Sequence, residues 1–108
     1  MSSKQAASIA PEEIAQFSAH AGDWWNPAGK FRLLHQINPV RLQYIRDQVV
    51  GQGMPGRRPL QGLKVLDVGC GGGLLCEPMA RMGGYVTGLD ASAKAIDTAR
   101  KHAEVSGL

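Results

Sequence analysis

A short stretch of the chain combines bare backbone with acidic side chains, and both features suit the binding of small ligands. In "KVLDVGCGGGLL", residues 64–75, four of the five residues 69–73 are glycine. An apolar run precedes the glycines and another follows them. Glycine adopts backbone conformations that other residues resist, and without a Cβ atom its backbone can touch a ligand directly. The stretch predicts a turn from a strand into a helix, whose positive end then faces the ligand.

Two carboxylates accompany this turn. Asp67 lies two places before Gly69, and Asp90 ends a second strand-like segment, "YVTGLD", 21 residues after Gly69. A carboxylate that follows the second strand can accept hydrogen bonds from both hydroxyls of a ribose. The turn and Asp90 together therefore predict a cofactor of the adenosine type at the carboxyl end of a sheet.

Two classes of cofactor compete for such a site. Dinucleotides favour the pattern G-x-G-x-x-G, which from Gly69 requires a glycine at the position of Leu74. The pattern found is D-x-G-x-G-x-G, formed by Asp67, Gly69, Gly71 and Gly73. An acidic residue beside the turn disfavours a pyrophosphate and favours a cationic amine. We therefore predict S-adenosylmethionine, which carries an ammonium and a sulfonium but no phosphate, and keep a dinucleotide as the alternative.

The elements that position this site follow from periodicity and turn signals. We expect one helix that starts at Pro11 and another that has Asn38 as its N-cap, followed by a glycine-rich linker. Downstream we expect a short buried strand at 64–69, a helix from Gly73 or Leu74 to residue 84 and a strand at 85–90. A last helix follows, with Ser92 as its N-cap and Gly107 just past its end. This order is the opening of a doubly wound, mostly parallel α/β sheet. The expected division is a disordered tail at 1–10, a helical segment and linker at 11–61, and the first part of a cofactor domain at 62–108.

Composition disfavours several other classes of protein. The chain has 108 residues and a net charge of +3, and no dense basic face of the kind that nucleic-acid binding needs. Cys70 and Cys76 match no zinc spacing, so we expect reduced thiols and assign no metal ligand. No run approaches the ~20 apolar residues of a membrane span, and the opening residues lack a secretory signal. We therefore expect a cytoplasmic protein.

The segments "VLDVGCGGG" and "VTGLD" resemble motif I and the acidic motif of class I S-adenosylmethionine-dependent methyltransferases. Upstream, "FSAHAGDWWNPAGKFRLLHQINPVRLQYI", residues 17–45, closely resembles the amino-terminal region of the ubiquinone-biosynthesis O-methyltransferases. The resemblance implies a Rossmann-like fold and methylation of catechol hydroxyls on polyprenylated ring intermediates. It also implies that Arg41, Gly69 and Asp90 contact the cofactor. Another small-molecule methyltransferase of the same fold and a non-catalytic cofactor-binding module remain as alternatives.

The same resemblance sets expectations beyond the cofactor. The family is more than twice as long, so we expect an amino-terminal fragment, truncated after the second strand and its helix. The catalytic base stays unassigned, and residues for a divalent metal would lie beyond Leu108. Peripheral contact with the inner face of the membrane and a complex with other ubiquinone-biosynthesis enzymes are further expectations. The 108 residues alone are expected to fold poorly and to turn over no substrate, because two parallel strands leave apolar side chains without partners.

Aromatic residues outside the glycine turn have two interpretations. Trp24 and Trp25 could anchor a core or form a lid over an apolar substrate, and the residues alone favour the core. His20 and His35 receive no role, and His102 is expected to be exposed on its helix.

Overall fold

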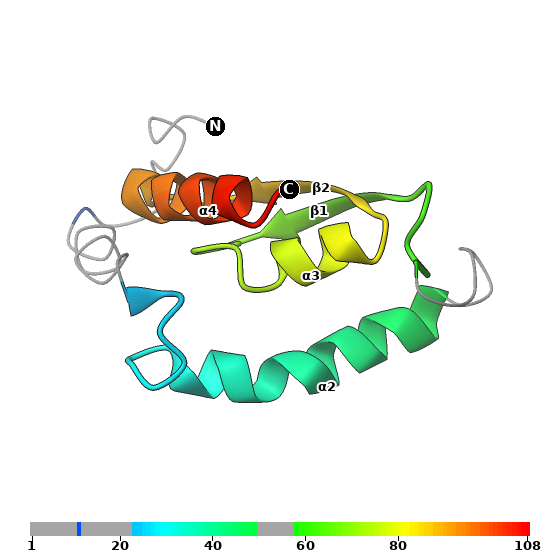
Figure 1. The fold of residues 1–108 in the computed structure, drawn as a ribbon, viewed down its shortest axis with the longest axis horizontal. Coiled ribbons are helices and arrows are strands. Elements are labelled where there is room, and N and C mark those ends of the chain that lie inside the picture. Colours follow the sequence, from blue (N-terminus) through cyan, green and yellow to red (C-terminus); the bar gives the residue numbers. More distant parts are fainter. Residues whose placement is uncertain (1–10, 12–22, 50–57) are drawn as a thin grey trace.

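The computed structural model describes Pro11, residues 23–49 and residues 58–108 (Figure 1). The elements follow in the order α2 (Arg32–Val49), β1 (Lys64–Val68), α3 (Cys76–Arg81), β2 (Tyr85–Leu89) and α4 (Ala93–Val105). The two strands are parallel. This order confirms the predicted opening of a Rossmann-like class I fold. The tail at 1–10 and the first helix lie outside the described residues, except that Pro11 itself is helical.

One face of the sheet is partly covered and the other is exposed. Along both strands, exposed side chains alternate with more buried ones. On the open face, Leu66, Val68 and Tyr85 expose 59%, 74% and 69% of their surface. The expectation of a buried first strand is therefore wrong for this face, whereas α3 contacts the sheet through β2. The sheet carries the glycine turn at one end, and its open face offers apolar surface.

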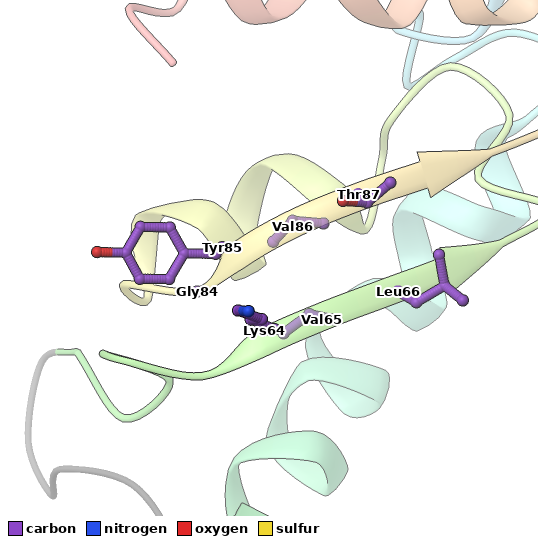
Figure 2. Close-up of a pocket in the computed structure, with 7 residues that line it drawn as sticks. All are labelled: Lys64, Val65, Leu66, Gly84, Tyr85, Val86 and Thr87. Atoms are coloured by element: carbon purple, nitrogen blue, oxygen red, sulfur yellow. The ribbon is translucent and has the colours of Figure 1, made fainter. Parts of the chain in front are cut away.

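A hollow on the sheet lies away from the glycine turn. Residues 64–66 and 84–87 line it (Figure 2). These residues are the first part of each strand, whereas the turn follows Val68 at the carboxyl end of β1. Ligands of open α/β sheets bind outside the carboxyl ends of the strands. The hollow is therefore distinct from the site that the sequence predicts.

The helix predicted from Asn38 begins earlier. Helix α2 starts at Arg32, so Pro39 lies inside it and Asn38 is not its N-cap. An interior proline removes one helical hydrogen bond and normally disfavours this arrangement. Packing outweighs that cost, because Phe31, just before α2, stacks on the buried Trp24, and Leu34 packs against the hydrophobic core. Tertiary contacts have thus extended the helix toward the amino terminus, beyond the start that Asn38 and Pro39 predict.

Helix α4 follows its predicted signals at both ends. The Ser92 hydroxyl accepts a hydrogen bond from the amide of Ala95 at 3.2 Å, which confirms Ser92 as the N-cap. Gly107 has φ of 78° and donates to the carbonyl of Glu104 at 3.1 Å. The amide of Leu108 donates to the carbonyl of residue 103 at 2.8 Å, which completes a Schellman motif.

The middle of the chain packs more closely than its composition indicates. Pro59 and Leu60 were placed in the predicted linker, but both are buried, and the amide of Leu60 donates to the carbonyl of Met82 at 2.9 Å. Helix α3 starts at Cys76, later than expected, and holds Pro78 in its first turn. The hydrophobic core beneath α2 and α4 consists of Trp24, Leu74 and Ala95, with Trp25, Phe31 and Leu34 packed against it.

Candidate functional site

The glycines of the turn have the backbone conformations that their pattern predicts. Gly69, Gly71 and Gly73 have φ of 74°, 55° and 91°. Side chains with a Cβ atom resist this left-handed region, so the turn needs glycine at these three positions. Gly72, which lies between them, has no positive φ. The alternating pattern G-x-G-x-G therefore indicates the positions with left-handed backbone. The presence of glycine at position 72 must have another cause.

The surroundings of the four glycines differ. A Cβ atom on Gly69 would meet nothing within 4 Å, whereas one on Gly71 would lie 2.8 Å from Cζ2 of Trp24. A Cβ atom on Gly72 would lie 2.5 Å from Cγ of Trp24, which explains why glycine is also needed there. Gly73 approaches helix α4, where a Cβ atom would meet that of residue 99 at 3.4 Å. One end of the turn is therefore open and its middle is covered by an indole.

Asp90 is bonded to the turn and to the start of α4. Its Oδ2 accepts from the amide of Gly71 at 2.9 Å, and its Oδ1 accepts from the amide of Ser92 at 2.9 Å. The amides of Gly69 and Cys70 donate to the carbonyl of Leu89 at 2.7 and 2.9 Å. The end of β2 thus supports the glycine turn directly. A carboxylate has about four acceptor positions, so Asp90 can accept further hydrogen bonds.

Asp67 lies on the covered side of β1, next to a thiol. Its Oδ2 accepts from Sγ of Cys76 at 3.3 Å. A hydrogen bond with Cys70, burial and the Asp67 carboxylate together raise the pKa of the Cys76 thiol well above its ordinary value. The hydrogen bond from Cys76 lowers the pKa of Cys70, against burial and the carboxylates of Asp90 and Asp67. Both cysteines are free, and Cys70 is buried.

The protonation of Cys76 gives a testable prediction. An ordinary cysteine with a pKa of ~8.5 is about half thiolate at pH 8.5, and the thiolate is the nucleophile. We expect iodoacetamide at pH 8.5 to modify native Cys76 at least about tenfold more slowly than the same residue in urea.

The raised pKa keeps the thiol of Cys76 protonated in the folded state. The folding stability that this protonated thiol contributes is therefore lost as pH rises above about 8.5. Asp67→Asn should speed the modification, as measured by peptide mass spectrometry, and an unchanged rate would contradict the role of the carboxylate.

Arg41 reaches the turn through one intermediate residue. Its guanidinium donates to Oδ1 of Asn38 at 3.3 Å, and Nδ2 of Asn38 donates to the carbonyl of Leu74 at 2.6 Å. The structure therefore places Arg41 on α2, linked to the end of the glycine turn. Of the predicted site residues, Gly71 and Asp90 are in direct contact, and Asp67 stands at the end of β1 beside the turn.

Sequence reasoning missed a second set of residues behind the turn. The indole Nε1 of Trp25 donates to the carbonyl of Gly72 at 2.8 Å, and its ring stacks on His102 with centroids 3.6 Å apart. Nδ1 of His102 lies 2.6 Å from Oε2 of the buried Glu77. His102, which was expected to be exposed, keeps 34% of its side chain exposed and is half-buried. Its position continues the face of Ala95 on α4 at helical spacing, and that periodicity could have indicated burial.

The first tryptophan belongs to the core, as the residues alone favoured. Trp24 exposes only 8% of its surface and stacks on Phe31, with ring centroids 3.8 Å apart. Nε2 of His35 lies 2.8 Å from its carbonyl oxygen, so His35 has a structural role. The buried Nε1 of Trp24 has no hydrogen-bond partner among the described residues.

The described residues form neither a membrane-spanning helix nor a cluster of metal-ligating side chains. None of the helices in residues 23–49 and 58–108 has the length and apolar character needed to cross a bilayer. In the same part of the chain, no three side chains of His, Cys, Asp or Glu gather so that they could hold a metal ion.

Comparison with known proteins connects this geometry to a family. Residues 65–108, from β1 to the end of the chain, match a family model described as a methyltransferase domain. A ubiquinone biosynthesis O-methyltransferase from Sinorhizobium medicae is 57% identical over 111 residues, which cover 100% of this chain and 45% of the relative. The protein of the same name from Maricaulis maris is 53% identical, with 94% of this chain and 40% of the relative covered. The one from Chelativorans is 59% identical, with 89% and 39% covered.

The chain thus spans less than half the length of the curated relatives that it matches. The matched identity extends upstream of the methyltransferase domain, into the segment that carries the tryptophan pair and Arg41. Over its length the chain is therefore similar to ubiquinone biosynthesis O-methyltransferases, and its residues 65–108 match a methyltransferase domain.

Proposed function

We propose that this protein is an S-adenosylmethionine-dependent O-methyltransferase of ubiquinone biosynthesis, which methylates a catechol hydroxyl of a polyprenylated ring. The observation that supports it most is the glycine turn held by Asp90, with three left-handed glycines and a bond from the Gly71 amide to Asp90 at 2.9 Å. The names of the relatives supply the pathway. When bound, S-adenosylmethionine supplies a methyl group on a sulfonium.

Each predicted site residue has a part in this proposal. Asp90, which accepts from the amides of Gly71 and Ser92, also accepts hydrogen bonds from the ribose hydroxyls. Asp67 faces the ammonium of the methionine moiety, directly or through water. Arg41 forks onto its carboxylate. The bare turn at Gly69, Gly71 and Gly73 lies against the nucleoside, and no residue of the chain is assigned as the catalytic base.

Two observations fit a ligand at this turn. Gly69 is exposed, has a left-handed backbone and faces open space, so a ligand can approach its backbone at the end of β1. The buried indole Nε1 of Trp24, on the side chain that covers Gly71, has no acceptor among the described residues. A buried donor without an acceptor costs about 1–3 kcal/mol, which a ligand acceptor would offset.

The activity can be tested in two forms of the protein. The complete protein is incubated with labelled S-adenosylmethionine and a short-tailed catechol precursor of a quinone, and transfer of label to the ring oxygen is followed. A chimaera in which this chain replaces the 111 aligned residues of the Sinorhizobium medicae relative should also transfer the label. Cofactor binding without transfer in both forms would favour a binding module. Transfer to other small phenols alone would favour another methyltransferase of the fold.

The cofactor assignment has its own prediction. Asp90→Asn removes a charged acceptor, and hydrogen bonds to charged groups contribute about 1.5–3 kcal/mol. We therefore expect the affinity for S-adenosylhomocysteine, measured by calorimetry, to fall about 10- to 100-fold. Asp97→Asn is the matched control, because it makes the same charge change at an exposed α4 residue paired only with Lys101 in the described residues. Equal affinities of the two variants would remove the ribose argument.

The proposal carries three expectations without site residues. The polyprenyl tail of the substrate suggests work at the membrane surface, which vesicle co-sedimentation of the complete protein would test. A complex with other ubiquinone-biosynthesis enzymes would show in co-purification. A divalent metal belongs to the proposal through the family resemblance, and no residue of this chain is assigned to it.

A further inference from the structure

Helix α3 has a gap in its hydrogen-bond ladder where it leaves the glycine turn. The amide of Glu77 donates to the carbonyl of Gly73 at 3.1 Å, and the amide of Met79 donates to the carbonyl of Leu75 at 3.2 Å. The bond between these two would run from residue 78 to the carbonyl of Leu74. Pro78 has no amide hydrogen, so the helix cannot make it. Leu74 exposes only 5% of its surface, so its carbonyl depends on a donor from elsewhere in the protein.

The side chain of Asn38 supplies that donor from another part of the fold. Its Nδ2 donates to the carbonyl of Leu74 at 2.6 Å, across 36 residues of sequence. Asn38 lies in the middle of α2, so the bond joins α2 to the point where the glycine turn becomes α3. Leu74 directly follows Gly73, the last left-handed glycine of the turn. The position of α2 therefore bears directly on the geometry of the turn.

We propose that Asn38 is a positioning residue for the cofactor site, which acts by replacing the amide hydrogen that Pro78 lacks. The inference rests on the proposed function. It assigns Asn38 no contact with the cofactor: its amide holds the carbonyl of Leu74, and that bond fixes the carboxyl-terminal end of the turn. Because Pro78 leaves the carbonyl of Leu74 without a helical donor, cofactor affinity depends on Asn38 in the amino-terminal segment. A helix with all its backbone hydrogen bonds would not need this donor.

The proposal predicts a rescue. Asn38→Leu keeps the size of the side chain but removes the donor, so we expect affinity for S-adenosylhomocysteine in the complete protein to fall about two- to tenfold. Pro78→Ala restores an amide hydrogen that points along α3 at the carbonyl of Leu74. Pro78→Ala alone should change affinity less than twofold, and Asn38→Leu combined with Pro78→Ala should recover most of the lost affinity.

The double variant distinguishes this positioning role from an indirect effect in which Asn38→Leu releases Arg41. Oδ1 of Asn38 also accepts from Arg41 at 3.3 Å, so Asn38→Leu could act by releasing that guanidinium. Pro78→Ala cannot restore the contact with Arg41, so failure of the double variant to recover affinity would overturn the proposal. Gln43→Ala, which removes an exposed amide from α2 that donates to Asp47 at 2.9 Å, is the control and should leave affinity unchanged.

A second measurement keeps the test independent of the cofactor assignment. Amide hydrogen exchange of a peptide that spans residues 71–77 should be faster in Asn38→Leu than in the parent protein and slow again in the double variant. If the parent protein does not bind S-adenosylhomocysteine, the proposed function fails while the exchange result still decides whether Asn38 holds the turn. Unchanged exchange in Asn38→Leu would overturn the positioning role.

Discussion

Gly71→Ala should be among the most damaging single substitutions in the glycine turn. Its Cβ atom would lie 2.8 Å from Cζ2 of Trp24, and its backbone has φ of 55°. Left-handed backbone costs an L-residue about 1–2 kcal/mol, and overpacking adds about 1–3 kcal/mol. We expect the free energy of unfolding to fall by about 2–5 kcal/mol, measured by urea denaturation of the complete protein, with loss of cofactor binding.

Two other glycines separate the causes of that effect. Gly107→Ala imposes a left-handed residue with φ of 78° where nothing lies within 4 Å, so it reports backbone strain alone. Gly72→Ala places a Cβ atom 2.5 Å from Cγ of Trp24 without a positive φ, so it reports the contact alone. If Gly71→Ala costs no more than Gly107→Ala, Trp24 does not cover the turn as described.

His102→Leu should have the second large effect, because it leaves a buried carboxylate without its nearest partner. Glu77 exposes 3% of its surface, with its Oε2 2.6 Å from Nδ1 of His102 and its Oε1 3.3 Å from the guanidinium of the half-exposed Arg81. His102 is half-buried, and a hydrogen bond to a charged group contributes about 1.5–3 kcal/mol. Since Arg81 remains, we expect a loss of about 2 kcal/mol in urea denaturation. The stacking partner of Trp25 is lost as well.

The control and the rescue for His102→Leu lie on the same two helices. Lys101→Ala breaks an exposed pair with Asp97, 2.9 Å long, which is worth at most about 1 kcal/mol. Glu77→Met removes the carboxylate that needs a partner, so it should recover much of the stability lost in His102→Leu. An additive loss in the double variant would show that the pair contributes nothing specific.

Local chemistry made part of the structure predictable from the sequence. The left-handed turn was predicted from Gly69, Gly71 and Gly73 because only glycine adopts that backbone readily. Both ends of α4 were predicted because Ser92 and Gly107 satisfy end groups within a few residues. The parallel strands followed from short apolar runs separated by a helical segment. For the turn and the ends of α4, the deciding interaction lies within a few residues of the chain.

The errors share an origin in contacts between distant segments. Helix α2 runs through Pro39 because Phe31 stacks on Trp24 and Leu34 packs against the hydrophobic core, and no local signal reports that packing. Asn38 has the composition of an N-cap, yet its amide bonds to Leu74 far along the chain. His102 is held by a carboxylate 25 residues away. The roles of Arg41 and Asp67 toward a cofactor stay predictions, because they concern a ligand rather than the chain itself.

Gly88, in the middle of β2, limits the order in which neighbouring positions can change during evolution. A Cβ atom there would lie 2.7 Å from Sγ of Cys70 and 3.1 Å from Sγ of Cys76. Alanine at 88 therefore requires the sulfur of Cys70 to shift or to be lost, so it is less strained after Cys70 has been replaced by a smaller residue than before. Across homologous sequences, residues larger than glycine at position 88 should thus occur together with alanine or glycine at position 70.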